Sequence, residues 1–218
     1  MKRFLVATVA TMFAIGMLAI GHAVAQDVSQ PTAVPDARGD SYVLGDQMLA
    51  LGASLVLPLF TYLPTDDVDG SGITGTNLTP GGKLSLNWNA FLGPRLTVGA
   101  EVGGMFAIDR HGEPLLMVPV TGRLGYQFSS DLLGLGQFDL PVFVNAGVGF
   151  MKLADLFNVN LVLRPGAAVF YRYDRNWSFG GSVSVWLMFE PLWGPASAGS
   201  GPGLAAFLDI SPQIVYHF

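Results

Sequence analysis

The fold is decided by Arg95–Ile108, which reads RLTVGAEVGGMFAI. Its residues alternate between two kinds with a period of two, which is the repeat of a β-strand. One face carries Leu96, Val98, Ala100, Val102, Phe106 and Ile108, and the other carries Arg95, Thr97, Gly99, Glu101, Gly103 and Met105. About 9–11 strand residues cross a bilayer at a tilt. The segment therefore predicts a strand of a transmembrane barrel, with its apolar face toward lipid and its small or polar face toward a filled lumen.

The same alternation recurs along the chain between clusters of Gly, Pro, Asp and Asn. It predicts eight strands, at Gln47–Phe60, Gly81–Leu92, Arg95–Ile108, Leu115–Phe128, Asp139–Leu153, Asn158–Tyr173, Trp177–Glu190 and Leu204–Phe218. An even number of antiparallel strands closes a sheet with both ends on one side and no unpaired edge in lipid. We predict an all-β fold over residues 47–218, a closed antiparallel transmembrane β-barrel of about eight strands.

The composition of the 218 residues agrees with this prediction. Half of the residues are hydrophobic, only 12% are charged, and the mean hydropathy is +0.46. A soluble domain carries about 25% charged residues, so this chain has apolar surface that must meet lipid, a partner or a large core. The absence of cysteine excludes disulfides, zinc–thiolate sites, a cysteine nucleophile and a lipid-modified N-terminal cysteine. A net charge of −5 without a basic run argues against nucleic acid as a partner.

The N-terminus predicts export. Lys2 and Arg3 precede an apolar run from Phe4 to Ile20, and Ala23-Val24-Ala25 supplies the small residues of a cleavage site. We expect a signal peptide over residues 1–25, followed by a periplasmic N-terminal tail over residues 26–46. An uncleaved membrane anchor is the alternative, because the apolar run is only slightly shorter than a full span.

The connections and the aromatic residues predict an orientation. Gly93-Pro94 and Asp174–Asn176 are tight turns, whereas Thr61–Pro80 and Pro191–Gly203 are long, as expected for loops at the cell surface. Aromatic side chains are expected in two interfacial belts. The inner belt comprises Tyr126, Phe128, Tyr171, Tyr173, Trp177, Phe179, Tyr216 and Phe218, and the outer belt comprises Phe106, Phe150, Phe189 and Trp193. A soluble β-sandwich or lipocalin-like barrel, the structural alternative, would not require such belts.

The last strand carries an assembly signal. Ile210, Pro212, Ile214, Tyr216 and Phe218 alternate outward, and the chain ends on Phe218. This pattern resembles the C-terminal signal of bacterial outer-membrane proteins. Together with the signal peptide and the series of strands, it is similar to the small outer-membrane barrels of the OmpW, OmpA and OmpX type. The resemblance implies residence in the bacterial outer membrane, with both barrel ends periplasmic. It also implies periplasmic chaperones and the barrel-assembly machinery as partners, with Tyr216 and Phe218 as the recognised residues.

A narrow barrel is filled by its own side chains, so the inward residues decide function. Near mid-height the alternation points Glu101, Arg123 and Arg164 inward, with Asp209 somewhat higher. Buried acids and bases must pair, because an isolated buried charge is very costly. We expect a polar plug in which Arg123 pairs with Glu101. The plug either holds the barrel shut or acts as a gate whose ion pairs exchange partners.

Above this layer the inward residues become apolar. The lumen candidates are Phe60, Met105, Met117, Met151, Trp186, Met188 and Phe207. Methionine side chains are flexible and polarizable, which suits irregular apolar ligands. An apolar vestibule over a polar floor resembles the OmpW-like barrels and implies a small hydrophobic ligand. A well-packed upper lumen without a cavity is the alternative, and a one-residue slip would turn these residues toward lipid.

Other motifs predict no further site. Asp66–Gly72 has the spacing of a calcium loop, but Thr76 stands where the final glutamate is needed. A rim hydrolase built on His111 would need serine and acid partners, and no G-x-S-x-G elbow is present. We therefore expect no enzyme activity, no metal and no cofactor. The sequence favours a barrel that binds or admits small hydrophobic molecules; a structural or surface-interaction barrel with a closed lumen, of the adhesin or antigen type, is the alternative.

Overall fold

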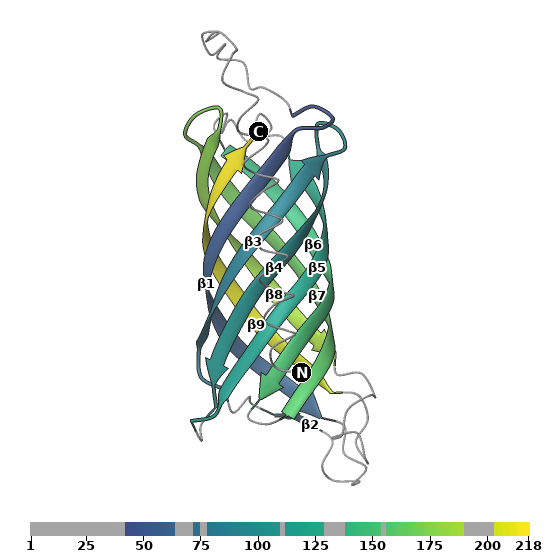
Figure 1. Ribbon diagram of the computed structural model, residues 1–218, viewed down its shortest axis with the longest axis vertical. Helices are drawn as coiled ribbons and strands as arrows, with labels where there is room; N and C mark the ends of the chain where they lie inside the picture. The colour runs from purple at the N-terminus through teal and green to yellow at the C-terminus, as the bar shows by residue number, and fades with distance from the viewer. Residues whose placement is uncertain are drawn as a thin grey trace, which may run out of the picture. The chain divides into compact units, whose positions relative to one another are not determined.

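The chain folds into an antiparallel β-barrel (Figure 1). The computed structural model describes residues 42–63, 72–74, 78–109, 112–128, 138–153, 156–189 and 203–218. The strands are β1 (Gln47–Leu63), β2 (Gly72–Thr74), β3 (Gly81–Phe91), β4 (Leu96–Ile108), β5 (Pro114–Phe128), β6 (Phe138–Leu153), β7 (Leu156–Arg172), β8 (Trp177–Phe189) and β9 (Leu204–His217). No helix in this part of the chain is long and apolar enough to cross a membrane.

Eight of these strands close the barrel. Each long strand pairs with the next in the chain, and β1 pairs with β9 to complete the ring. β2 is a short addition that pairs only with the end of β1. Closure leaves the eight long strands without a free edge, which is the requirement for a sheet in lipid.

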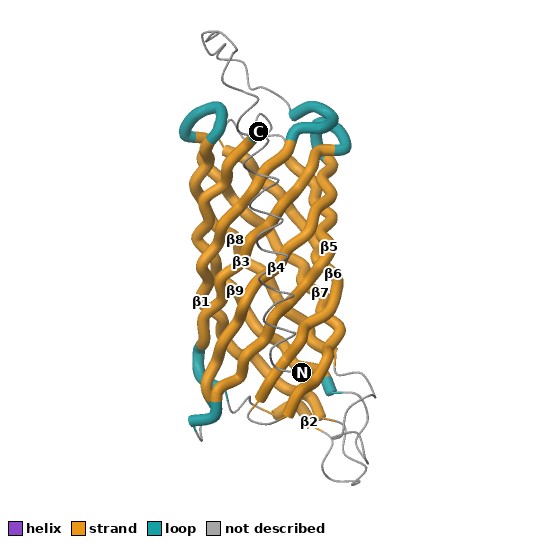
Figure 2. The backbone as a smooth tube through the Cα atoms, in the orientation of Figure 1, coloured by secondary structure: helices purple, strands orange, loops and turns teal. Residues whose placement is uncertain are grey.

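The two ends of the barrel differ. At the terminal end, where β1 begins and β9 ends, residues 92–95 and 173–176 form tight turns between strands (Figure 2). The opposite end, where β1 ends and β9 begins, is the far end. At the terminal end the first and last strands are joined by backbone bonds, since Gln47 and Phe218 each donate to the carbonyl of the other at 3.0 Å.

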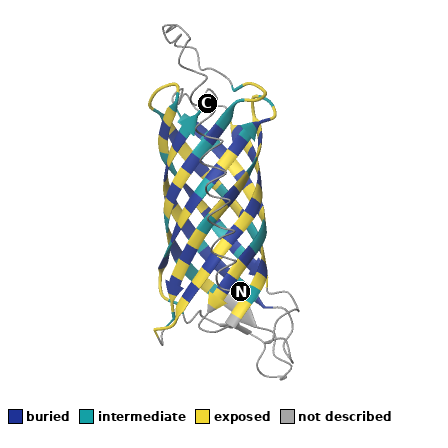
Figure 3. Ribbon diagram, viewed as in Figure 1, coloured by how far each residue is buried: buried dark blue, intermediate teal, exposed yellow. Residues whose placement is uncertain are grey.

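Inward and outward residues alternate along the strands (Figure 3). In β5 every second side chain is buried from Leu115 to Gln127, and the residues between them are exposed. The exposed positions of the barrel are mostly Leu, Val, Ile and aromatic residues, so the outer wall is apolar. The same pattern in β4 confirms the two faces predicted for Leu96–Ile108, whereas Arg95, predicted to face inward, is exposed in the turn before the strand. An apolar exterior around a polar and apolar interior is the arrangement of a transmembrane barrel.

All eight predicted strands are present, and their ends differ from the prediction by up to three residues. The largest structural difference lies in β1, which runs on to Leu63 and pairs there with β2, where the sequence predicted only a loop from Thr61. The register of β1 against β9 also shifts between Pro58 and Phe60, which marks a β-bulge at Leu59. A bulge adds one residue to a strand and reverses the alternation beyond it.

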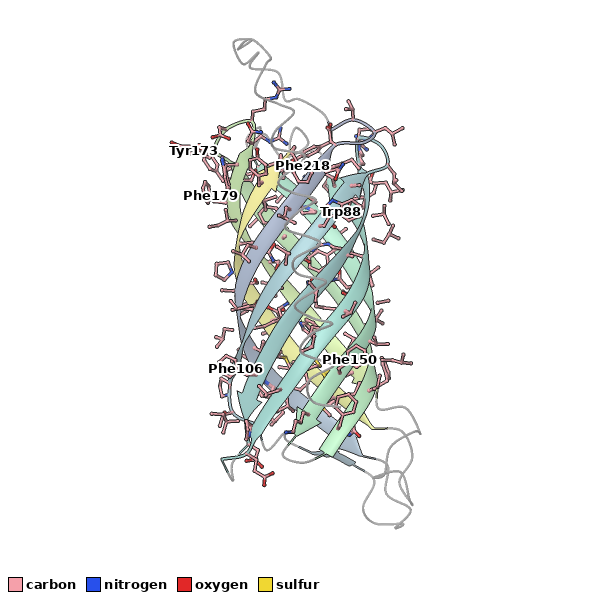
Figure 4. The ribbon with its side chains drawn as sticks, viewed as in Figure 1. Trp88, Phe106, Phe150, Tyr173, Phe179 and Phe218 are labelled. Atoms are coloured by element: carbon pink, nitrogen blue, oxygen red, sulfur yellow. The ribbon has the colours of Figure 1, made fainter. Side chains whose placement is uncertain are left out.

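Exposed aromatic side chains lie near both ends of the barrel. Tyr173, Phe179, Phe218 and Trp88 lie toward the terminal end, whereas Phe106 and Phe150 lie toward the far end (Figure 4). Rings in the terminal group contact one another, as in the edge-on pair of Tyr173 and Phe179 and the pair of Trp177 and Tyr216. Trp88 was not among the predicted belt residues, and Trp193 lies outside the described part of the chain. Two groups of exposed rings are the pattern expected for interfacial belts.

Candidate functional site

The centre of the lumen holds a buried charge cluster, formed by Lys83, Glu101, Arg123, Arg164 and Asp209. Glu101 on β4 accepts a hydrogen bond from each of two guanidinium nitrogens of Arg164 on β7, Nη1 to Oε1 and Nη2 to Oε2. Lys83 Nζ on β3 lies 3.2 Å from Glu101 Oε1, and Asn145 donates to Oε2 at 2.9 Å. Both carboxylate oxygens are therefore satisfied, as a buried carboxylate requires.

The second acid of the cluster is Asp209 on β9. Its Oδ2 lies 2.7 Å from Lys83 Nζ and 3.7 Å from Arg164 Nη1, and it accepts a 2.9 Å hydrogen bond from Trp186 Nε1. Lys83 and Arg164 thus bridge the two acids and link β3, β4, β7 and β9 through the lumen. The four residues form a continuous polar plug.

Arg123 does not hold the predicted position in this plug. The sequence predicted that it pairs with Glu101, but within the described residues no carboxylate lies within 4 Å of its guanidinium. Arg123 instead donates to Asn87 Oδ1 at 3.3 Å and lies 3.8 Å above the ring of Phe143. The prediction differs from the structure because two other residues pair with Glu101. Arg164 reaches its carboxylate across the lumen, and Lys83 reaches it from β3.

An apolar cluster fills the lumen beside the plug, toward the far end. It comprises Val56, Met105, Ala107, Leu115, Met117, Met151, Val162, Trp186, Met188 and Phe207. Six of the seven predicted lumen candidates are therefore members: Met105, Met117, Met151, Trp186, Met188 and Phe207. The members are at most 8% exposed. Trp186 lies at the boundary, because its ring contacts the apolar cluster and its Nε1 contacts the plug.

Phe60, the seventh candidate, is not part of this cluster. Beyond the bulge at Leu59, Phe60 pairs with Ala206, and Ala206 pairs with Leu187 on β8. Directly paired residues share a face of the sheet. Trp186 and Phe207, the neighbours of this pair, face inward, so Phe60 lies on the outer face. A strict period of two across β1 predicted the opposite, because a bulge leaves no clear mark in the sequence.

Tyr42, which precedes the first strand, packs against the apolar group at the terminal end. Tyr42 stacks on Phe91 with ring centroids 3.9 Å apart, and its hydroxyl donates to Asp139 Oδ2 at 2.7 Å. Arg172 donates to both oxygens of Asp139 and lies 4.9 Å from the ring of Tyr42. Burial and the adjacent carboxylate of Asp139 raise the pKa of Tyr42 above its usual range, so the hydroxyl stays protonated and remains a donor.

Glycine at position 45 helps to place this ring. Gly45 has φ of +99° in the turn ahead of β1, a conformation that favours glycine, and its N–H donates to the carbonyl of Phe91. The turn returns Tyr42 over the mouth of the barrel. Residues Tyr42–Asp46, predicted as the end of a tail, are thus attached to the barrel.

Four of the charged or hydrogen-bonding residues of these sites were missed from the sequence: Lys83, Tyr42, Asp139 and Arg172. Lys83 could have been found, since it shares the parity of the inward residues Asn87 and Asn89 on the same strand. Tyr42 had no such signal, because it precedes the first strand and has no periodic neighbours. Of the assembly-signal residues, Phe218 is exposed and Tyr216 is half-buried, both near the terminal end.

Some predicted features lie outside the described residues: the signal peptide over residues 1–25, the loop Asp66–Gly72 and His111. In the described ranges no group of three or more His, Asp or Glu side chains is arranged to hold a metal ion.

The closed ring, the apolar exterior and the filled lumen define a small transmembrane-type β-barrel of eight strands. A model of an uncharacterised protein family matches residues 28–216, and the chain belongs to that family.

Three comparisons accompany this assignment. A Borreliella burgdorferi protein without an assigned function is 28% identical over 136 residues, which span 53% of this chain and 62% of that relative. A Treponema pallidum protein, also without an assigned function, is 24% identical over 185 residues, or 80% of this chain and 78% of the relative. The crystal structure of Neisserial surface protein A superposes with a TM-score of 0.54 at 9% identity, covering 80% of this chain and 99% of that one. This likeness shows the fold alone.

Proposed function

We propose that this barrel resides in a bacterial outer membrane and binds a small hydrophobic molecule in the apolar cluster of its lumen. The observation that carries the proposal is the cluster itself, which contains four methionines together with Trp186 and Phe207. Methionine side chains rearrange at low cost, so a cluster rich in them can admit an apolar guest by changing rotamers. The outer wall, apolar between two groups of aromatic rings, supports residence in a bilayer.

Passage straight through the lumen does not fit this arrangement. The Lys83, Glu101, Arg164 and Asp209 plug lies on the terminal side of the apolar cluster, and Tyr42 covers the terminal mouth. A hydrophobic molecule would have to break buried ion pairs to pass the plug, which is costly. The proposed site is therefore a pocket with a polar floor, reached from the far end.

The proposed orientation follows from the connections. Two of the three connections at the terminal end, residues 92–95 and 173–176, are tight turns, and the third spans residues 129–137. The two longest connections, residues 64–80 and 190–203, join strands at the far end, where residues 154–155 form a short connection. Outer-membrane barrels have short periplasmic turns and longer external loops. We therefore place both chain ends in the periplasm and the loops 61–80 and 191–203 at the cell surface. Periplasmic chaperones and the barrel-assembly machinery are the partners that such a protein would need.

One observation favours a second function. The members of the apolar cluster are nearly inaccessible to solvent, as they would be in a barrel whose lumen is permanently packed. A structural or surface-interaction barrel would have this interior, and its function would lie in the loops. The two proposals differ in whether a guest molecule can separate these side chains.

Quenching of Trp186 by 1-bromooctane tests the pocket. We would change Trp88, Trp177 and Trp193 to Phe, refold the barrel in lipid vesicles, and follow the fluorescence of Trp186. A binding site gives quenching that saturates with probe concentration. A second variant that keeps only Trp88, whose ring faces outward, should show unsaturated quenching by probe dissolved in the membrane.

Two methionine variants provide the matched comparison. Met117→Ala changes the apolar cluster, whereas Met48→Ala makes the same change in the separate apolar group at the terminal end. We expect only Met117→Ala to alter the saturation midpoint. Unsaturated quenching of Trp186, equal to that of Trp88, would refute the pocket and favour the packed structural barrel.

A further inference from the structure

The charges buried in the central lumen do not balance. Lys83, Arg123 and Arg164 supply three positive charges, whereas Glu101 and Asp209 supply two negative charges. Among the described residues the one other buried charge is Asp139, at the terminal mouth, and Arg172 neutralises it. The described buried side chains of the lumen, with all of these groups ionised, therefore carry one excess positive charge. Uncompensated charge in a barrel interior is very costly, so a compensating anion is expected.

The excess charge is located on Arg123. Lys83 and Arg164 share both carboxylates, whereas Arg123 has no described carboxylate within 4 Å. A guanidinium has five N–H donors, and Arg123 makes one hydrogen bond to a described residue, the bond to Asn87 Oδ1. The ring of Phe143 attracts the guanidinium but carries no net charge. Arg123 thus keeps unused donors, and its charge has no described carboxylate in direct contact.

A second unused donor belongs to the same contact. The Nδ2 of Asn87 is buried and has no hydrogen-bond partner in the structure, although the Oδ1 of the same amide accepts from Arg123. A buried donor without a partner costs about 1–3 kcal/mol. The guanidinium of Arg123 and the Nδ2 of Asn87 are therefore neighbours, linked through Oδ1 of Asn87, and both offer N–H donors to an acceptor.

We propose that a small inorganic anion of the size of chloride binds between the Arg123 guanidinium and the Asn87 amide and neutralises the lumen. The size follows from burial, because Arg123 is 6% exposed and Asn87 is fully buried, so a larger anion would displace the surrounding side chains. The anion site is separate from the apolar pocket of the proposed function. It lies against the polar plug and neutralises the charge of Arg123 beside it.

Exchange of chloride for gluconate tests the site. The full barrel in zwitterionic detergent is unfolded by heat in sodium chloride and in sodium gluconate at equal sodium concentration, and chloride-35 NMR linewidths are measured in parallel. Chloride should raise the unfolding midpoint and show a broadened resonance, because gluconate is too large to enter. Arg123→Gln should abolish both effects, whereas Arg175→Gln, in an exposed turn, should leave them unchanged.

Asn87→Asp provides a test that does not depend on removing a charge. This nearly isosteric change places a carboxylate beside Arg123, so residue 87 itself supplies the negative charge that the proposed anion would bring. We expect its unfolding midpoint in gluconate to exceed that of the parent chain, and its chloride response to disappear. Equal midpoints of the parent chain in the two salts, a chloride response retained in Arg123→Gln, or a lower midpoint for Asn87→Asp would each overturn the proposal.

Discussion

Arg164 and Glu101 form a two-bond ion pair between strands that are not neighbours in the barrel. Glu101 lies on β4 and Arg164 on β7, so the pair crosses the lumen instead of running along the wall. Such a pair fixes the distance between these two strands across the lumen, since both hydrogen bonds require a defined separation of the two planar groups.

Replacing Arg164 with Gln should destabilise the barrel strongly. The change leaves Glu101 with Lys83 as its remaining ion-pair partner, and it also removes the ion pair between Arg164 and Asp209. Breaking a buried ion pair by removing one partner costs about 3–5 kcal/mol. Urea-induced unfolding in lipid vesicles would measure the loss. Arg175→Gln in the exposed turn is the control, and an equal effect of the two changes would mean that the ion pair contributes nothing.

Replacing Arg123 with Ala should cost less than replacing Arg164. Arg123 pairs with no described acid, so its removal leaves one acceptor without a donor, Oδ1 of Asn87. Such a loss is worth about 1–3 kcal/mol. If the plug also serves as a gate, the variant should raise conductance in planar bilayers. A loss for Arg123→Ala as large as that for Arg164→Gln would indicate that it does compensate Glu101.

Adjacent residues on β5 test the inward and outward faces. Met117 is 1% exposed and belongs to the apolar cluster, whereas Val118 is 39% exposed on the outer wall. Met117→Asp should abolish probe binding at Trp186, because a carboxylate in an apolar interior is costly. Val118→Asp should leave binding intact and hinder membrane insertion. Normal insertion of Val118→Asp together with failure of Met117→Asp to insert would contradict this assignment of the faces.

The closure by Tyr42 should weaken at alkaline pH. The pKa of the tyrosine is raised in the closed state, so closure is fully stable below about pH 10, the ordinary pKa of the free side chain, and loses stability as pH rises further. Tyr42→Phe keeps the stacking on Phe91 and removes the ionisable hydroxyl. Hydrogen exchange at the N–H of Gly45 reports opening, and it should accelerate above pH 10 more in the parent chain than in Tyr42→Phe.

Deleting Phe218 should impair membrane assembly much more than folding in detergent. Its exposed ring is the proposed recognition element, whereas its backbone contributes two hydrogen bonds to Gln47. Phe218→Ala keeps those bonds and removes the ring. Outer-membrane levels in cells and refolding yields in detergent give the two measurements. Unchanged membrane levels of both variants would rule out the recognition role.

Strand positions were predictable because alternation is a local property. In β4 and β5 every inward and outward residue could be assigned from the sequence, since an apolar outer wall and a filled lumen impose opposite chemistry on neighbouring positions. The face of Phe60 was predicted wrongly because a bulge shifts the alternation by one residue without changing residue types. This prediction failed because the bulge in β1 arises from its pairing with β9, which the sequence of β1 alone does not show.

Partner choice within the lumen was not predictable. The sequence placed Glu101, Arg123, Arg164 and Asp209 inside, but the pairing depends on which side chains meet across the barrel. Arg123 lies on the strand adjacent to Glu101, and nearness along the sheet suggested a pair. In the structure Arg164 pairs with Glu101 instead, because its side chain spans the lumen. The distance between β4 and β7 depends on how the whole ring of strands closes.

The docking of Tyr42 has a consequence for biogenesis. Its contacts come from Phe91 on β3, Asp139 on β6 and Arg172 on β7, with the ring of His217 on β9 5.7 Å away. These residues are translated well after Tyr42 and come together only when the last strand has joined the first. The full set of contacts around the tyrosine therefore exists only in a closed barrel, and its burial would distinguish closed molecules from intermediates in which the ring of strands is still open.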